Sequence, residues 1–138
     1  MTRRMRWMAA AACALLSAAT LMAADGSWLH KVPASERGRV NPLAGQTEAV
    51  AAGKLLFAEN CAKCHGDDAL GRHERPSLRS ERIARATDGE IAWMLRNGNR
   101  WKGMPSWSAL PEPQRWQIIS YLRSLQTEKT LEPTGEKR

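Results

Sequence analysis

The chain has 138 residues, which is enough for one small domain. Its 21 basic and 14 acidic residues give a net charge of +7 at pH 7. This excess is modest and no basic stripe interleaved with aromatic residues accompanies it, so the composition argues against nucleic acid as a partner. The three cysteines are too few for a disulfide framework.

The first 24 residues have the layout of a secretory signal peptide. Three arginines occur among the first six residues, and an uncharged run rich in Ala and Leu follows from 7 to 24. Small residues close the run, which predicts cleavage after Ala24, with Ala19 as an alternative. A retained membrane anchor is the competing interpretation, although about 18 Ala-rich residues make a marginal span. Removal of the leader lowers the net charge to +4, and we expect a periplasmic protein without a stable membrane span.

Residues 25–46 follow the leader and show neither a helical nor a strand period. Pro33, Pro42, Gly38 and Gly45 interrupt this stretch, which predicts an N-terminal extension without regular structure. Helical spacing begins at about residue 47, where Val50 and Phe57 supply apolar positions, and it runs up to the cysteines at 61 and 64.

Two further helices are predicted after a polar, irregular stretch from 66 to 86. Thr87 and Glu90 form a capping box at the start of the first helix, and Asn97-Gly98 ends it. The second helix runs from about 113 to 125 with an apolar stripe that contains Tyr121. Because no segment alternates with a period of two, we expect an all-α fold of three to four helices.

These elements divide the chain into four parts. Residues 1–24 are the predicted signal peptide and 25–46 the extension. Residues 47–125 are the predicted globular domain, and 126–138 a flexible polar tail. No internal repeat suggests a second domain.

The motif Cys61-Ala62-Lys63-Cys64-His65 carries the chemistry of the chain. Two thiols three residues apart on a helical turn can bond the two vinyl groups at one edge of a porphyrin, and the adjacent imidazole then lies under the iron. The motif therefore predicts one covalently attached haem c, with Cys61 and Cys64 as thioether ligands and His65 as the proximal iron ligand. A zinc site is disfavoured because it needs four ligands and the chain has no second cysteine pair. A thiol oxidoreductase lacks the βαβ context that such enzymes use.

Met104 is the predicted distal iron ligand. It lies in a loop between Gly103 and Pro105, where glycine allows close approach of the backbone and proline favours an extended residue before it. His73 and His30 are weaker alternatives, and an ordinary buried Met is the competing structural interpretation. If the sixth position were open or labile, the protein would instead be a haem enzyme or a gas sensor.

The residues from about 48 to 125 resemble the class I c-type cytochromes. Gly53 and Phe57 stand eight and four residues before the first cysteine of the motif, as in the N-terminal helix of that family. Ile118 and Tyr121 resemble the paired positions of its C-terminal helix, and the segment from 95 to 107 resembles its distal-ligand loop. The resemblance implies a small cytochrome c fold with long loops, in which the N- and C-terminal helices cross around one haem.

Pro76 and Trp101 also have predicted roles at the haem. Pro76 lies eleven residues after His65 and resembles a family proline whose carbonyl accepts the Nδ1–H of the proximal His, which would orient the ring and raise its basicity. The alternative is that Pro76 only shapes a loop. The indole N–H of Trp101 can donate to a haem propionate, or the ring can be half-buried packing. Pocket walls are expected from Phe57, Met94, Leu95, Trp107, Ile118 and Leu122.

A filled coordination sphere leaves no position for a substrate, so we expect an electron-transfer protein and not an enzyme. The predicted function is transfer of single electrons between redox proteins of a respiratory or dehydrogenase chain, from a dehydrogenase or reductase to an oxidase. We expect the protein to be a monomer. The alternative is a haem c subunit held permanently to an exported dehydrogenase of the quinoprotein type. The sequence does not identify the donor, the acceptor or the reduction potential.

Overall fold

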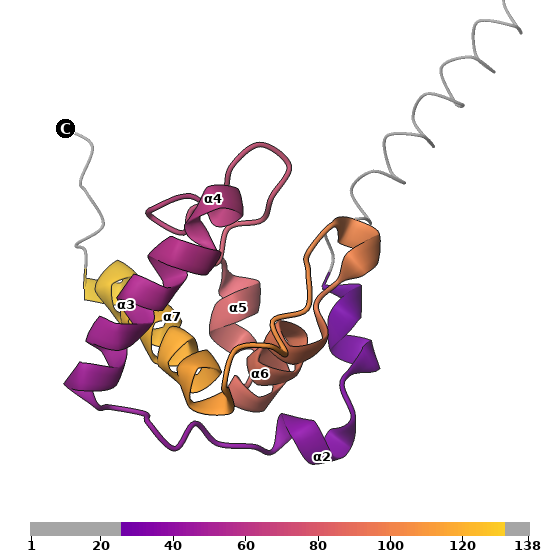
Figure 1. The fold of residues 1–138 in the computed structure, drawn as a ribbon, viewed down its shortest axis with the longest axis horizontal. Coiled ribbons are helices and arrows are strands. Elements are labelled where there is room, and N and C mark those ends of the chain that lie inside the picture. Colours follow the sequence, from indigo (N-terminus) through magenta and orange to yellow (C-terminus); the bar gives the residue numbers. More distant parts are fainter. Residues whose placement is uncertain (1–25, 132–138) are drawn as a thin grey trace, which may run out of the picture.

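The computed structural model describes residues 26–131, and every regular element in that range is helical (Figure 1). The elements in chain order are the 3-10 turn η2 (Ser27–Lys31), α2 (Ala34–Arg37), α3 (Thr47–Asn60), α4 (Ala62–His65), α5 (Glu81–Arg85), α6 (Asp88–Asn97), the 3-10 turn η3 (Arg100–Lys102) and α7 (Glu112–Leu131). The prediction of an all-α fold is confirmed.

Helices α3 and α7 cross in close contact and form the centre of the domain (Figure 1). Gly53 permits this contact, because a Cβ atom built at that position would lie only 1.9 Å from the carbonyl oxygen of Gln117 in α7. Four residues further along α3, the ring of Phe57 packs on Tyr121 with 5.3 Å between centroids and 57° between the ring planes. The predicted crossing of the N- and C-terminal helices is therefore present.

Helix α6 lies against α7 and begins and ends as its sequence predicts. The Thr87 hydroxyl accepts from the Glu90 amide at 3.1 Å, and the Glu90 carboxylate accepts from the Thr87 amide at 2.8 Å, which completes the capping box. The helix ends at Asn97, and Gly98 follows with a φ of +69°, a conformation that favours glycine.

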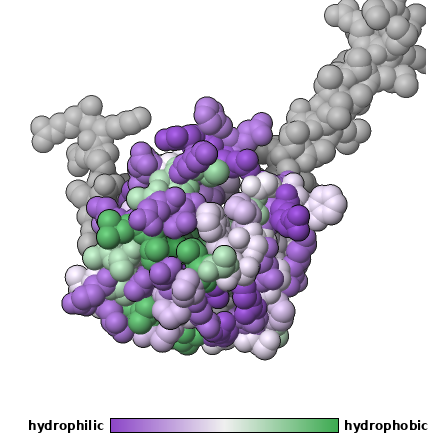
Figure 2. Space-filling view, viewed as in Figure 1, coloured by the Kyte–Doolittle hydropathy of each residue, from purple (hydrophilic) through white to green (hydrophobic). Residues whose placement is uncertain are grey.

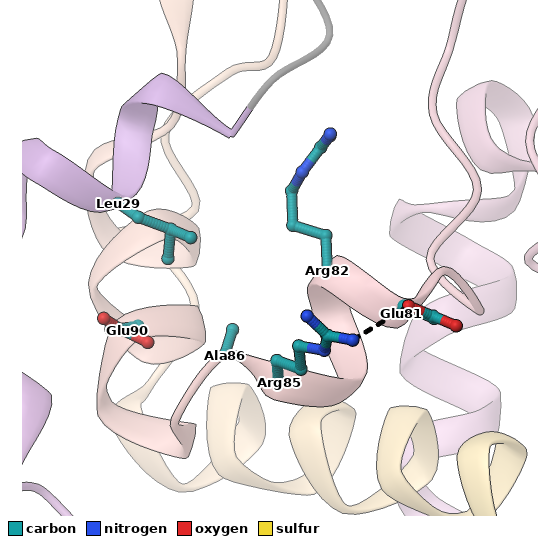
Figure 3. A pocket seen from close by; sticks show the side chains of 6 residues that line it. All are labelled: Leu29, Glu81, Arg82, Arg85, Ala86 and Glu90. Carbon is teal, nitrogen blue, oxygen red and sulfur yellow. Dashed lines mark hydrogen bonds and ion pairs between the residues drawn. The ribbon is translucent and has the colours of Figure 1, made fainter.

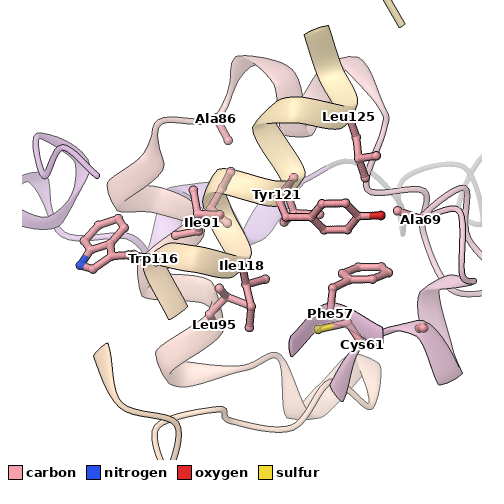
Figure 4. Close-up of a cluster of buried hydrophobic side chains, with 14 residues drawn as sticks. Phe57, Cys61, Ala69, Ala86, Ile91, Leu95, Trp116, Ile118, Tyr121 and Leu125 are labelled. Atoms are coloured by element: carbon pink, nitrogen blue, oxygen red, sulfur yellow. The ribbon is translucent and has the colours of Figure 1, made fainter. Parts of the chain in front are cut away.

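One buried apolar cluster joins α3, α6 and α7 (Figure 4). Phe57, Ile118 and Ile119 are the largest side chains in it with less than 2 % of their surface exposed. Cys61 belongs to the same cluster, so the cysteine motif begins at the edge of the core. Burial of apolar surface is the main force that holds these helices together.

The structure corrects the prediction for two stretches that were expected to be irregular and for the end of one helix. The stretch 25–46 was expected to lack regular structure, but η2 and α2 lie within it, held partly by the Arg37 side chain, which donates to the carbonyls of Val32 and Leu29. The stretch 66–86 contains the short helix α5. Helix α7 continues past residue 125 to Leu131. The predicted signal peptide and residues 132–138 lie outside the described residues.

Arg123 joins α7 to the end of α5 and to the start of α6. From α7 it donates to the carbonyls of Ile83 at 3.0 Å and Ala86 at 2.5 Å, and it pairs with Asp88 at 2.7 Å. One guanidinium thus satisfies carbonyls at the C-terminal end of α5 and a carboxylate in the first turn of α6. No pattern along the chain indicates this contact, because its partners are 35 to 40 residues away.

Candidate functional site

The cysteine motif occupies one helical turn at the junction of α3 and α4. The amide of Cys61 donates to the carbonyl of Phe57 at 2.8 Å, and the carbonyl of Cys61 accepts from the amides of Cys64 at 3.1 Å and His65 at 3.0 Å. Neither cysteine is part of a disulfide, and Cys61 is buried whereas Cys64 is exposed. Helical backbone through the motif is what places two thiols and an imidazole next to one another.

The ring of His65 is held by a backbone carbonyl. Its Nδ1 lies 3.0 Å from the carbonyl oxygen of Pro76. Because a carbonyl oxygen can only accept a hydrogen bond, this contact requires a proton on Nδ1, and in the neutral ring Nε2 is then the nitrogen with a free lone pair. The loop between His65 and Pro76 is held by a second hydrogen bond, in which the amide of Gly71 donates to the carbonyl of His65 at 2.8 Å.

Burial makes Cys61 a poor nucleophile. It raises the pKa of the Cys61 thiol to about 11, and the neighbouring Cys64 adds to the shift. The thiolate is the reactive form of cysteine, and disulfide oxidoreductases depend on a lowered pKa. The raised pKa therefore does not favour Cys61 as the attacking thiol of a disulfide exchange.

Met104 lies in the loop between α6 and α7. Its amide and carbonyl pair with the carbonyl and amide of Asn99 at 3.0 and 2.9 Å, and Gly103 precedes it with a φ of +77°. The Met104 side chain is half-buried and packs against the apolar cluster that contains Cys61. Met94, in contrast, is buried within α6.

The expected pocket walls come together with one exception. Four of the six belong to the buried cluster around Cys61 and a fifth packs on it, namely Phe57, Leu95, Ile118, Leu122 and Trp107. Figure 4 shows Phe57 directly beside Cys61, with Ile118 in the middle of the cluster. Met94 is buried but is not a member of this cluster.

The comparisons with known proteins identify the domain that carries this site. The family model described as cytochrome C oxidase, cbb3-type, subunit III matches residues 48–122. The chain belongs to this family. The predicted resemblance to c-type cytochromes is thereby confirmed, and the cofactor of such a cytochrome domain is covalent haem c.

A curated relative of this cytochrome domain is the Cbb3-type cytochrome c oxidase subunit CcoP of Rhodobacter capsulatus. The two sequences are 36% identical over 84 residues, a match that covers 54% of this chain and 28% of the relative. The chain therefore spans little more than a quarter of that relative's length.

The residues of the cytochrome domain fit a haem c. Two unlinked thiols share one turn with a histidine whose Nδ1 is engaged by Pro76 and whose Nε2 remains for a metal. A thioether side chain packs against the same apolar cluster from the α6–α7 loop. Thiol, imidazole and thioether are the groups that hold and ligate haem c.

Arg75 is a residue at this site that the sequence did not single out. Its guanidinium donates to the carbonyl of Lys102 at 2.6 Å and lies next to Gly103, where a Cβ atom would approach it to 2.9 Å. The loop that carries Pro76 is thus joined to the loop that carries Met104. Arg75 belongs to an arginine-rich run, and nothing local distinguishes it from the other arginines there.

Trp101 lies in η3 with 94 % of its surface exposed. The alternative that it forms half-buried packing is therefore wrong. Its neighbours Arg100 and Lys102 are also exposed.

The side facing the viewer in Figure 2 is hydrophilic at the top, over α4 and the loop that follows it, and apolar toward α3.

A separate hollow of about 550 Å³ lies away from the cysteine motif (Figure 3). It is lined by Leu29, Glu81, Arg82, Arg85, Ala86 and Glu90. Glu81 and Arg85 form an ion pair with each other at 3.2 Å across one turn of α5.

Within residues 26–131, no helix is both long enough and apolar enough to cross a membrane.

Proposed function

We propose that this cytochrome domain carries one haem c and passes single electrons between redox proteins outside the cytoplasm. The observation that carries the proposal is the turn that joins the side chains of Cys61 and Cys64 to His65, whose Nδ1 lies 3.0 Å from the Pro76 carbonyl. The sequence contains one such motif, which supports a single haem. When bound, the haem supplies a one-electron iron couple.

In this proposal Cys61 and Cys64 are the covalent attachment points, His65 is the proximal ligand and Met104 the distal ligand. The hydrogen bond to the Pro76 carbonyl fixes the plane of the imidazole and raises the basicity of its Nε2. A neutral thioether and an apolar surround both disfavour extra positive charge, so we expect a high reduction potential. With both axial positions filled, the protein is a carrier and not a catalyst.

The exposed tip around Trp101 supports weak docking to an acidic partner. Arg100 and Lys102 flank the indole, and all three side chains are exposed. Electron-transfer encounters use small interfaces that are steered by charge. Trp101 therefore serves either as a contact to a partner or, as the sequence suggests, as a donor to a haem propionate.

The second candidate is a haem subunit of a larger enzyme. The relative named as an oxidase subunit favours a terminal oxidase over a dehydrogenase as the assembly that would hold it. Size-exclusion chromatography of the native protein from its host separates the two functions. A free carrier elutes alone, whereas a subunit co-elutes with oxidase or dehydrogenase chains.

The export route is part of the proposal and has its own test. A basic leader followed by an apolar run supports secretion to the periplasm. Mass spectrometry of the mature protein should show a chain that begins after Ala24 or Ala19 and carries the mass of one haem. A correctly exported but colourless product would refute the haem and the function together.

The assignment of Met104 is tested by a matched pair of substitutions. Met104→Leu and Met94→Leu each remove one sulfur at nearly constant volume. Met104→Leu should abolish the thioether-to-ferric-iron absorption, open the iron to added ligands and lower the reduction potential. Met94→Leu should change none of these, because Met94 is buried in α6. An unchanged spectrum in Met104→Leu would show that another group ligates the iron.

A further inference from the structure

The described part of the N-terminal extension, residues 26–46, packs on the cytochrome domain, and we call it the N-terminal arm. It lies outside the part of the chain that the family model matches, residues 48–122. Val32 and Asn41 are each only 3 % exposed. The Asn41 amide donates to the Trp116 carbonyl at 3.1 Å and to the Ser120 hydroxyl at 2.9 Å, so the end of the arm is anchored on α7.

The middle of the arm is set directly on α6. A Cβ atom at Gly89 would lie 1.9 Å from the backbone oxygen of Glu36, so the two backbones touch. The hydroxyl of Thr87, at the start of α6, donates to the carbonyl of Arg37 at 2.8 Å. These contacts leave α2 no freedom to slide along α6 without breaking hydrogen bonds or colliding with backbone.

The position of α2 brings one carboxylate to the side chain of an arginine from the last turn of α6. Glu36 pairs with Arg96 at 2.7 Å and with Arg39 at 3.4 Å. The hydrogen bond from Arg96 is the largest cause that holds the pKa of Glu36 below its ordinary value, so the carboxylate is ionised at neutral pH. Arg39 is held in turn by Glu112 at the start of α7.

Arg96 is also where the loop with Met104 is attached. The carbonyl of Arg96 accepts from the Ser106 hydroxyl at 2.5 Å, and the carbonyl of the preceding Leu95 accepts from the Trp107 amide at 2.8 Å. Gly98 lies against this segment so closely that a Cβ atom there would be 2.5 Å from the Pro105 oxygen. The segment 105–107, directly after Met104, therefore rests on the last turn of α6.

We propose that the N-terminal arm braces the distal-ligand loop, with Glu36 acting as a positioning residue through Arg96. Glu36 holds the Arg96 side chain while the Arg96 backbone holds Ser106, two residues from Met104. The brace keeps the loop closed, which keeps the Met104 thioether in place. This inference rests on the proposed role of Met104 as an iron ligand.

The test uses the haem-loaded protein and imidazole as a competing ligand of ferric iron. Imidazole binds only when the thioether has left, so its apparent affinity reports how often the loop opens. Glu36→Gln should tighten imidazole binding about three- to fivefold, the range of a partly exposed ion pair. Arg96→Gln should do the same, and the double variant should show no further gain.

The matched control is Glu81→Gln. It makes the same change of charge in an ion pair with Arg85 on α5, far from the loop in sequence. Imidazole affinity in Glu81→Gln should equal that of the unaltered protein. Equal gains in both Glu variants would reduce the effect to net charge and overturn the proposal.

Three other outcomes would each overturn part of the proposal. An unchanged imidazole affinity in Glu36→Gln, with normal thioether absorption in the unaltered protein, overturns the brace and leaves the proposed function intact. Full additivity in the double variant overturns the route through Arg96. If the unaltered protein shows no thioether absorption, the role of Met104 fails and the brace fails with it.

Discussion

Substitution of Gly53 by Ala tests the central helix crossing. A Cβ atom there would lie 1.9 Å from the Gln117 oxygen and 2.5 Å from the Gln117 carbonyl carbon. Carbon and oxygen ordinarily approach no closer than about 3.3 Å, so the helices must separate by about 1.4 Å. The obstacle is the backbone of another helix, which cannot rotate away as a side chain would.

Two effects of the substitution have opposite signs. Helix propensity alone would make Ala more stable than Gly by about 1 kcal/mol. Overpacking against backbone costs about 3 kcal/mol, and separating Phe57 from Tyr121 costs about 1 kcal/mol more. We therefore expect Gly53→Ala to lower the free energy of unfolding by about 3 kcal/mol, which lowers Tm by roughly 10–20 °C.

The assay is chemical denaturation of the haem-loaded protein, followed by far-ultraviolet circular dichroism and Trp fluorescence. Gly38→Ala is the control, because nothing lies within 4 Å of a Cβ atom there and its φ is −79°. We expect that control to stay within about 0.5 kcal/mol of the unaltered protein. If Gly53→Ala were as stable as the unaltered protein, or more stable, the inferred contact between α3 and α7 would be refuted.

Three further predictions concern charge, the proximal loop and the exposed tip. The pKa of Glu36 lies below its ordinary value of 4.5 because Arg96 donates to it, so its stabilising contribution is complete above pH 4.5 and is lost as pH falls through the lowered pKa. Urea titrations should accordingly show a stability difference between the unaltered protein and Glu36→Gln at pH 6 that disappears well below pH 4.5; a difference that persists in acid would contradict this. Gly71→Ala should raise the reduction potential, because a Cβ atom there, 2.6 Å from the Arg75 oxygen and 3.0 Å from the Pro76 carbonyl carbon, displaces the carbonyl that makes the imidazole of His65 more basic; redox titration showing no rise would count against that bond. Trp101→Phe should leave the free energy of unfolding within about 0.5 kcal/mol because the ring is 94 % exposed, and a shifted potential in this variant would assign the indole N–H to a propionate, whereas slower electron transfer to an acidic partner at unchanged potential would assign it to docking.

Local chemistry explains why much of the fold could be predicted from the sequence. The capping box of Thr87 and Glu90 needs only residues three apart, and the turn of Cys61 to His65 needs only consecutive ones. The helical periods of α3, α6 and α7 likewise reflect neighbours along the chain. Helix α7 was predicted to end at 125, and it continues with Gln126 donating to the Leu78 carbonyl at 2.8 Å.

By itself, the sequence predicted that this chain is all-α and belongs with the c-type cytochromes, and both predictions are confirmed. It also pointed to Cys61, Cys64 and His65 as the residues of the proposed haem site. Only the tertiary structure showed that residues 26–46 pack on α6 and α7, since Glu36 meets Arg96 across 60 residues and Asn41 meets Ser120 across 79. Such contacts depend on which elements the burial of apolar surface brings together. An arginine or asparagine in an irregular segment carries no periodic signal, so its partner is decided only when the helices have packed.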